Sequence, residues 1–497
     1  EKPAVGPIQS TLWPFTPRVG LAICRQLGEE ASRVAETIPV KYFNHVQTLS
    51  SAMNSKQLRV AYVTSHFTSS SIGREMLFLI GAHSLDRISP YCYALNSDEG
   101  TWLQHTWRGA IQNACATFKD ISAFDDRKAA ETINGDEIHI LVDLNGWSGG
   151  HRVNMISTTP APVQVNYKNW VASSGIPALH FVVGDKYVSP PEYQSDYTEA
   201  MVMFPNTYFI SGHQFQYLLD NPIQKASEAG SKDRSRAEMR QKFGLPADPF
   251  LIANFNNLDK LEPRLWDMWI RLLEQLPHTG LWLQKYPPAK ANRVREMAKE
   301  EGRMNVQRLV LTDFFKSDDH IAIKALSDVF VDNPTYNAHS TAMDTLWGGL
   351  PFVTLPEEKM AARVGASLLM ALNVTQTIAR DMSDMFHITH QMASCRHCNE
   401  GLRAVMKKNK FSEPLFDTIR AVDNFEVSLR LMWEAATIRQ DRYDADDDDS
   451  SRFHQLVSLD VAARERPVRD QASEDRLVAK LRSLRVDTSQ AEKLNQR

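Results

Sequence analysis

Short apolar runs rich in β-branched residues alternate along the chain with longer stretches of helical periodicity. In the first half these runs are "LRVAYVTSHF" from residue 58, then "YCYAL", "IHILVDL", "PVQVNY", "FVVGD" and "MVMFP". Each run is apolar at most of its positions, which predicts a strand buried on both faces. Buried strands that alternate with helices are typical of a parallel sheet covered on both sides. The pattern therefore predicts an α/β lobe over residues 58–218.

The same alternation begins again after a polar stretch. Residues 219–247 carry many charges and turn formers and few residues to bury, which is typical of a linker. Strand-like runs then follow at "FLIANF", "LWLQ", "RLVL", "DVFVD" and "PFVTL". We therefore predict a second α/β lobe over residues 248–435, and a cleft between two Rossmann-type lobes. In such sheets ligands bind beyond the carboxyl ends of the strands.

The two ends of the chain differ from the lobes. Residues 1–57 predict a helical segment, and residues 436–497 form a tail with an acidic, solvated run at 446–449. Within this tail, "EDRLVAKLRSLRV" predicts a helix with Leu477, Leu481 and Leu484 on one face. Because the apolar stripe is narrow, we expect a helix docked on protein rather than one lying on a membrane surface.

Composition narrows the class of protein. The chain has 497 residues, with 43% hydrophobic and 23% charged residues, as in ordinary globular proteins of more than one domain. The 56 basic and 60 acidic residues nearly balance, which argues against a nucleic-acid partner. The sequence contains no run that is long and apolar enough to span a membrane, and no signal peptide at its start. Five cysteines, an odd number, favour a reducing compartment, so we expect a cytoplasmic or nuclear protein or a fragment of one.

Chemistry is expected where the strand "DVFVD" ends in the second lobe. The stretch "NPTYNAHSTAMDTLWGG" follows this strand and leads into a helix, whose exposed N–H groups and dipole suit a phosphate. Ser340 and Thr341 add hydroxyl donors at the same point. His339 suits stacking on a base, and Asp344 suits hydrogen bonds from ribose hydroxyls. The simpler alternative is that Ser340 or Thr341 is only an N-cap.

Two further strand ends carry groups suited to a nucleotide. Asparagines lie at the end of the stretch "FLIANFNN", the last of them Asn257, and Lys260 follows with a charge that can neutralise a diphosphate. The stretch "RLVLTDFFKSDDH" contributes Lys316 and His320. Each residue alone is equally compatible with an ordinary surface position. Three such strand ends together favour a nucleotide site.

One cluster has the residue types of a metal site. His387, His390, Cys395 and Cys398 in "MFHITHQMASCRHC" provide the four ligands of a structural zinc. A single Cys-x-x-Cys pair is a weak signal, however, and the stretch also has a helical pattern. An ordinary helix is therefore the favoured interpretation, and no metal is predicted.

Several of these segments resemble the catalytic region of the O-linked N-acetylglucosamine transferases, whose relatives include the SPINDLY protein O-fucosyltransferases. They are "PYCYALNSDEGT", "DEIHILVDLNGWSGG", "TPAPVQVNYKNWVASSG", "NFNNLDKLEP" and "DVFVDNPTYNAHSTAMDTLWGGLPFVTLPEEKMAARVGASLL". The likeness runs in order from about residue 7 to residue 433 and is strongest in the second lobe. It implies a GT-B architecture, and it implies that residues 1–57 resemble the segment after a tetratricopeptide array.

The resemblance also implies an activity. It is that of an inverting, metal-independent protein O-glycosyltransferase without a cofactor, which transfers N-acetylglucosamine from UDP-N-acetylglucosamine to serine or threonine in an extended segment of a protein acceptor. The turn "AHST" favours this donor over GDP-fucose. A protein O-fucosyltransferase and an inactive relative that acts as a scaffold or subunit remain alternatives. The N-terminal segment or the tail is the expected place for a further protein partner.

Site residues follow from the resemblance by position. In the second lobe it implies that Lys260 is catalytic and binds the donor diphosphate. The residues implied to bind the nucleotide with it are Asn257, His320, His339, Ser340, Thr341 and Asp344.

In the first lobe the resemblance implies catalytic positions at Asp136 and His139, near the reacting centre, and places the segment 207–209 by the sugar. The same lobe departs from the family pattern. Ser70 stands where the family has a histidine, His180 where it has an aspartate, and "NWVASSG" replaces "GYPGTSG".

Overall fold

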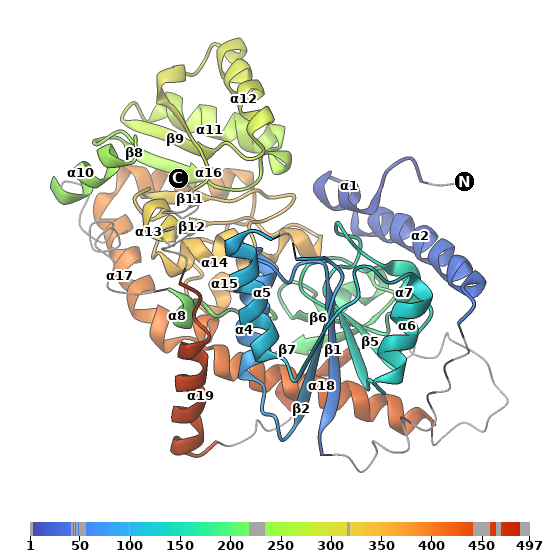
Figure 1. The fold of residues 1–497 in the computed structure, drawn as a ribbon. Helices are drawn as coiled ribbons and strands as arrows, with labels where there is room; N and C mark the ends of the chain where they lie inside the picture. The colour runs from blue at the N-terminus through green and yellow to red at the C-terminus, as the bar shows by residue number, and fades with distance from the viewer. Residues whose placement is uncertain are drawn as a thin grey trace. The chain divides into compact units, whose positions relative to one another are not determined.

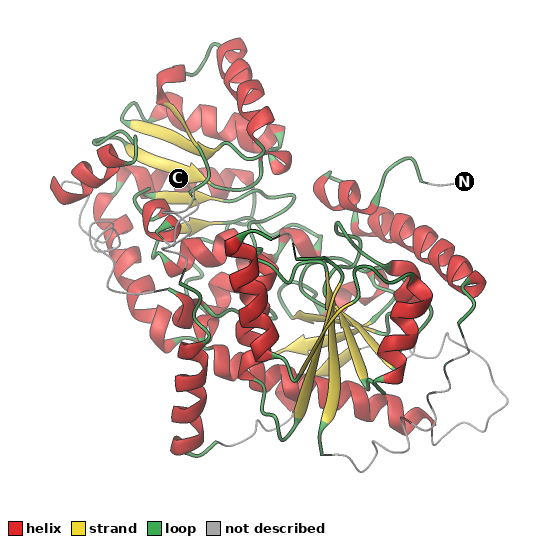
Figure 2. Ribbon diagram, in the orientation of Figure 1, coloured by secondary structure: helices red, strands yellow, loops and turns green. Residues whose placement is uncertain are grey.

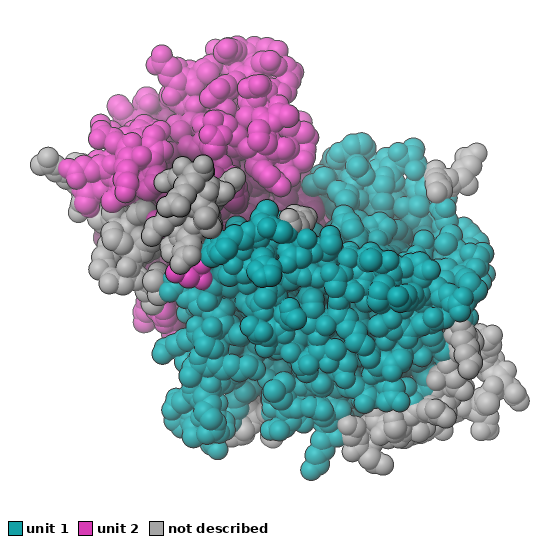
Figure 3. All heavy atoms as spheres, viewed as in Figure 1, with its two compact units in different colours: residues 1–216, 417–486 teal, residues 217–416, 487–497 magenta. Residues whose placement is uncertain are grey.

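The computed structural model of the protein describes residues 3–40, 43, 45, 48, 56–98, 100–217, 234–315, 319–440, 458–463 and 469–487. The chain divides into two compact units (Figure 3). Unit 1 comprises residues 1–216 and 417–486, and unit 2 comprises residues 217–416 and 487–497. The cleft expected between the lobes stays a prediction. The acidic run at 446–449 and Lys316 lie outside the described residues.

Among its described residues, unit 1 contains an eight-stranded parallel sheet in the order β13-β7-β6-β5-β4-β1-β2-β3 (Figures 1 and 2). The strands are β1 Leu58–Thr64, β2 Ile88–Ala94, β3 Thr117–Asp120, β4 Ile140–Asp143, β5 Val163–Asn166, β6 Phe181–Asp185, β7 Ala200–Phe204 and β13 Ser458–Asp460. β1 pairs with both β2 and β4, so Val63 lies between Tyr93 and Asp143. The six apolar runs of the first half all form strands, as predicted. β3 was not predicted, because its residues "TFKD" are largely polar and none is fully buried.

Helices cover the sheet of unit 1. They are α1 Pro7–Leu12, α2 Pro17–Thr37, α4 Ser71–Ala82, α5 Trp102–Ala114, α6 Asp126–Gly135, α7 Val153–Ser157, α8 His213–Gln216, α18 Thr418–Gln440 and α19 Gln471–Ser483. Figure 1 shows α4 and α5 on one side of the strands and α6 and α7 on the other. The predicted N-terminal helical segment forms α1 and α2. Gly28 of α2 contacts the backbone of Gly175 so closely that no Cβ fits between them.

The end of the chain returns to unit 1. Helix α18, which the sequence places largely within the second lobe, packs in unit 1, where the ring of Phe425 lies 4.9 Å from that of Tyr167. In α19, Leu477 and Leu481 are buried and Leu484 contacts Gly81 of α4. This is the docking helix that the sequence predicts. The apolar stripe identifies a helix that packs, but not the unit on which it packs.

Unit 2 is built on a five-stranded parallel sheet, counted over its described residues, in the order β10-β9-β8-β11-β12. The strands are β8 Phe250–Asn254, β9 Thr279–Gln284, β10 Leu309–Thr312, β11 Val329–Val331 and β12 Phe352–Val353. The helices are α10 Arg234–Lys242, α11 Pro263–Gln275, α12 Pro288–Glu301, α13 His320–Lys324, α14 Ser340–Trp347, α15 Val364–Ala371, α16 Met382–Ser394 and α17 Arg396–Ser412. All five predicted strands are present.

The described part of the predicted linker is helical. Its helix α10 carries Arg236 and Arg240, which are buried against unit 2 and paired with Asp328. The linker over residues 219–247 stays a prediction, and the sequence did not indicate that these two arginines are buried. The ion pairs to one carboxylate compensate the burial of both arginines.

The cysteines also differ from expectation. Disulfides join Cys92 to Cys115 and Cys395 to Cys398, and Cys24 is a buried free thiol. The sequence predicts reduced cysteines, because five cysteines are few for so long a chain and their number is odd. Within the described residues, no helix has the length and apolar character needed to cross a membrane.

Candidate nucleotide-binding site

Two adjacent strand ends of unit 2 are joined by a network of amide side chains. β8 and β11 are paired in the sheet, so Asn254 at the end of β8 lies beside the residues that follow β11. The side-chain oxygen of Asn333 accepts hydrogen bonds from Asn254 and Asn256, each 2.7 Å long. The network holds the loop after β8 against the loop after β11.

Asp332 lies at the centre of this network. It is fully buried, and its carboxylate accepts four hydrogen bonds that shape the turn into α14. The donors are the N–H groups of Asn333 (2.8 Å) and Ala338 (2.7 Å), the Thr354 hydroxyl (3.0 Å) and the Asn256 amide (3.1 Å). Burial raises the pKa of Asp332 above its ordinary value. Sequence interpretation missed this residue, although it directly follows a buried strand.

Lys260 is anchored to the same turn. Its Nζ donates to the carbonyl of Asn337 at 2.8 Å and lies 4.0 Å from the centre of the Tyr336 ring. Burial lowers the pKa of Lys260 to about 8, and the negative charge of Asp332 opposes this shift. The structure therefore places an ammonium group beside the loop that leads into α14.

His339 occupies the N-cap position of α14, and its side chain makes no capping hydrogen bond. Its ring stacks on Tyr336 with centroids 4.9 Å apart, so Tyr336 contacts both Lys260 and His339. Ser340 and Thr341 form the first turn of the helix and are partly exposed. The alternative in which either residue is only the N-cap is therefore wrong.

Asp344 and His320 lie together, although the sequence suggested them separately. His320 on α13 has its Nε2 3.1 Å from the Asp344 carboxylate, and Lys324 has its Nζ 3.6 Å from the same oxygen. All three residues are buried. Sequence interpretation missed Lys324, whose spacing of four residues from His320 places both on one face of a helix. The role of Asp344 at a ribose stays a prediction.

Asn257 supports the turn that presents Lys260. Its side chain accepts the Asp259 N–H at 2.8 Å and caps the short 3₁₀ helix Leu258–Lys260. This contact orients the backbone before Lys260. A direct contact of Asn257 with a nucleotide stays a prediction.

Asp136 and His139 lie in unit 1 before β4, at the end of that strand opposite its carboxyl end. Asp136 accepts a hydrogen bond from Lys119 at 2.7 Å, and His139 Nδ1 accepts the Arg59 N–H at 2.9 Å. The His139 ring packs against Trp433, and burial lowers the pKa of His139 to about 4. These contacts are those of packing residues. Their placement gives no support to a catalytic role, which stays a prediction.

The carboxyl end of β1 carries a histidine that sequence interpretation did not select. Ser70, at the family's histidine position, accepts the Gly73 N–H at 3.1 Å and caps α4. His66 precedes it in the same loop, and its buried Nε2 has no hydrogen-bond partner among the described residues. Burial lowers the pKa of His66, which favours a neutral imidazole. His66 therefore gives this loop a buried ring nitrogen that the described residues leave without a partner.

A buried ion pair orders the segment expected by the sugar. Lys168 follows β5 with a φ of 78°, and its Nζ lies 3.0 Å from the Glu75 carboxylate. The same Nζ donates to the Ile210 carbonyl at 2.9 Å and lies 3.2 Å from the centre of the Phe209 ring. Lys168 thereby holds the predicted segment 207–209 against the end of β5.

The zinc alternative fails in the structure. Cys395 and Cys398 form a disulfide, so their sulfurs are not available as thiolate ligands. Across the described part of the chain, no group of three or more histidine, cysteine, aspartate or glutamate residues is arranged to hold a metal ion.

Known sequences match most of this chain. The sequence model for glycosyl transferase family 41 matches residues 1–239 and 223–425. A protein of Arabidopsis thaliana named as the probable UDP-N-acetylglucosamine–peptide N-acetylglucosaminyltransferase SEC is 32% identical over 434 residues, covering 87% of this chain and 43% of that protein. A UDP-N-acetylglucosamine–peptide N-acetylglucosaminyltransferase of Caenorhabditis elegans is 26% identical, covering 87% of this chain and 46% of that protein. The chain thus spans less than half the length of these two relatives.

A solved structure matches the fold. An O-GlcNAc transferase mutant from Thermobaculum terrenum aligns with a TM-score of 0.73 at 24% identity, covering 87% of this chain and 77% of that one. Together with the two parallel sheets, this match shows the GT-B-like fold that the sequence predicts.

Proposed function

The chain belongs to glycosyl transferase family 41, and from this premise we propose that it transfers N-acetylglucosamine from UDP-N-acetylglucosamine to serine or threonine hydroxyls of proteins. The names of both curated relatives support this donor and a peptide acceptor. The transfer is inverting and needs neither metal nor cofactor. The acceptor enters as an extended segment, the compartment is the cytoplasm or nucleus, and a further protein partner binds the N-terminal segment or the tail.

The observation that carries the proposal is the position of Lys260 beside the turn into α14. As the glycosidic bond breaks, negative charge develops on the departing UDP. Lys260 and the uncapped N–H groups at Ser340 and Thr341 supply positive charge and dipoles from paired strand ends. This arrangement serves the purpose that a metal ion serves in other transferases.

The phosphate and nucleoside roles divide between two groups of residues. His339 and Lys260 flank Tyr336, next to the start of α14 where the diphosphate is proposed to bind. His320 and Asp344 form a second, buried pair on α13 and α14, which we assign to the nucleoside. The imidazole of His320 is oriented by the carboxylate of Asp344.

Calorimetric titration with UDP and with GDP tests the proposal, followed by assays of donor hydrolysis and of transfer to a peptide. We expect UDP to bind at least about tenfold more tightly than GDP, a difference of about 1.4 kcal/mol. Preference for GDP would support the fucosyltransferase alternative. Binding of UDP without turnover would support a scaffold, and binding of neither nucleotide would overturn the nucleotide site itself.

The affinity for UDP is expected to fall as the pH rises above about 8. The lowered pKa of Lys260 means that its ammonium group is charged below about pH 8 and loses its proton above it. Because a diphosphate binds the charged form, the loss approaches tenfold per pH unit until the pKa of the complex is reached. Calorimetry between pH 6.5 and 9.5, with about one titration per half pH unit, measures the affinity for UDP across this range. Lys260→Arg, which stays charged throughout, is the control and should lack this decline above pH 8; a flat profile in the unchanged protein would contradict the prediction.

A further inference from the structure

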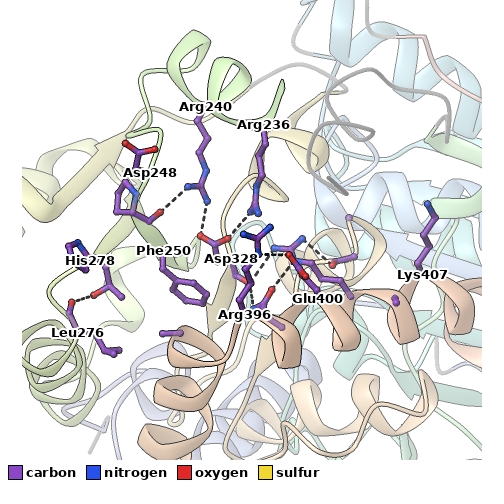
Figure 4. Close-up of a pocket in the computed structure, with 18 of the residues that line it drawn as sticks. Arg236, Arg240, Asp248, Phe250, Leu276, His278, Asp328, Arg396, Glu400 and Lys407 are labelled. Carbon is purple, nitrogen blue, oxygen red and sulfur yellow. Dashed lines mark hydrogen bonds and ion pairs between the residues drawn. The ribbon is translucent and has the colours of Figure 1, made fainter. Parts of the chain in front are cut away.

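Unit 2 contains a cavity of about 780 Å³ at the amino ends of its strands (Figure 4). The candidate nucleotide-binding site lies at the carboxyl ends of the same strands. Phe250 begins β8, Thr279 begins β9 and Asp328 directly precedes β11, and all three line the cavity. Its volume lies within the range of small-molecule sites. None of the residues discussed above for the nucleotide lines it.

The lining carries an excess of positive charge. Its acidic residues are Asp248, Asp328 and Glu400, and its basic residues are Arg236, Arg240, Arg396, Arg403, Lys407 and Lys410. Six cationic side chains thus face three carboxylates. Since these charges lie around one cavity, its field favours an anionic ligand.

The floor of the cavity concentrates this charge on buried groups. Arg236 and Arg240 share the single carboxylate of Asp328 at 2.9 and 2.7 Å, and Figure 4 shows both guanidinium groups directed toward it. The Arg236 side chain is only 4% exposed, and its Nε has no hydrogen-bond partner among the described residues. Burial, together with the charges of Arg240 and Arg396, lowers the pKa of Arg236. A buried N–H donor without a partner is costly, so a ligand acceptor there would stabilise it.

Apolar residues supply the remaining lining. They include Pro249, Phe250, Leu276, Pro277 and Ala393. A hydrated inorganic ion gains nothing by contact with such a surface. The apolar part of an organic ligand, in contrast, buries apolar surface area against it. Guanidinium groups match the oxygens of a phosphate in geometry and charge.

We propose that this cavity is a second ligand site, which binds an organic phosphate whose phosphate group lies among the arginines and whose apolar body lies against Phe250 and Leu276. The site is distinct from the UDP site and does not depend on the proposed transfer activity. Arg396, which lines the cavity, is half-exposed and pairs with Glu400, four residues further along the chain, at 2.7 Å.

Phenyl phosphate is the probe, titrated calorimetrically into the full chain with UDP present at saturation. We expect one binding event that inorganic phosphate reproduces with at least about tenfold lower affinity, because it lacks the apolar body. Arg396→Glu is expected to lower the affinity for phenyl phosphate by about tenfold or more, because it places a negative charge near the phosphate group. Arg127→Glu is the matched control, because Arg127 makes an exposed i,i+4 pair with Glu131 at 2.9 Å in unit 1.

Each outcome decides for or against the cavity. Loss in Arg396→Glu with retention in both Arg127→Glu and Lys260→Ala supports the second site. Binding that is seen only when UDP is left out, with retention in Arg396→Glu, places the probe in the nucleotide site and overturns the proposal. Absence of binding, or equal binding by Arg396→Glu and the unchanged protein, overturns it as well. Thermal unfolding of each variant separates a binding defect from a folding defect, and Lys407→Glu provides a second change among the lining residues of α17.

Discussion

Replacing Lys260 with alanine is expected to lower kcat for sugar transfer by about 10²- to 10³-fold, the usual cost of removing one preorganised donor to a developing charge. The ammonium group is anchored to the Asn337 carbonyl and stacked on Tyr336, so it is held beside the proposed diphosphate position before the reaction begins. Initial rates with UDP-N-acetylglucosamine and an acceptor peptide measure the effect. If the lysine acts on the departing diphosphate, its removal lowers kcat more than it raises KM.

Lys285 offers a matched control for this change. It follows the neighbouring strand β9 and pairs at 3.2 Å with Asp313, whose side chain is 83% exposed. We expect Lys285→Ala to keep kcat within about twofold, because an exposed pair of this kind contributes little. If Lys260→Ala also kept its kcat while UDP still bound, the assignment of Lys260 to the leaving group would be wrong.

Replacing Asp328 with alanine is expected to lower the free energy of unfolding of unit 2 by about 3–5 kcal/mol. The change leaves the buried guanidinium groups of Arg236 and Arg240 without their carboxylate and removes the acceptor of the Leu251 N–H. Urea unfolding followed by circular dichroism measures the loss. Asp267→Ala, which breaks a half-exposed pair with Arg303, is the control and should cost at most about 1 kcal/mol.

The acid dependence of stability gives a second check on Asp328. The three arginines 236, 240 and 403 lower the pKa of Asp328 in the folded protein despite its burial. A carboxylate with a lowered folded pKa stabilises the fold above its ordinary pKa of about 4, and this contribution is lost as the pH falls through the folded value. The Asp328→Ala variant lacks this part of the acid dependence. Equal losses in Asp328→Ala and Asp267→Ala would show that the arginines do not depend on the carboxylate.

Periodicity was sufficient for most of the secondary structure. The eleven apolar runs named from the sequence all form strands, because residues such as those of β1 are buried on both faces and have no polar alternation to obscure the signal. The two strands of the described chain that were missed, β3 and β13, are short edge strands of 4 and 3 residues. Their pairing partners, rather than their own composition, make them strands.

The candidate site divides in a similar way. Lys260, His320 and the stretch from His339 to Asp344 follow strands or begin helices, positions that a sequence pattern locates, and the chain belongs to the family that this pattern resembles. The contact of Tyr336 with both Lys260 and His339 joins residues from two strand ends, and local pattern carries no information on it. Local pattern also does not show where a side chain lies in the fold. Asp136 and His139 match a motif, yet the structure places them before β4 in packing contacts.

Local pattern thus established two parallel α/β lobes, the docking face of α19 and the strand ends that present nucleotide-suited groups, because hydrophobic periodicity and helix starts depend on neighbouring residues. The tertiary structure packs α18 in unit 1 and buries the arginines of α10 against Asp328. It also makes Asp332 the common acceptor of the hydrogen bonds that shape the turn before α14. Those outcomes depend on which distant carboxylate or carbonyl meets a buried charge. A charged residue in the sequence predicts solvent exposure unless its partner is known. Partners far apart in the chain, such as Arg236 and Asp328 at a separation of 92 residues, are chosen only by packing.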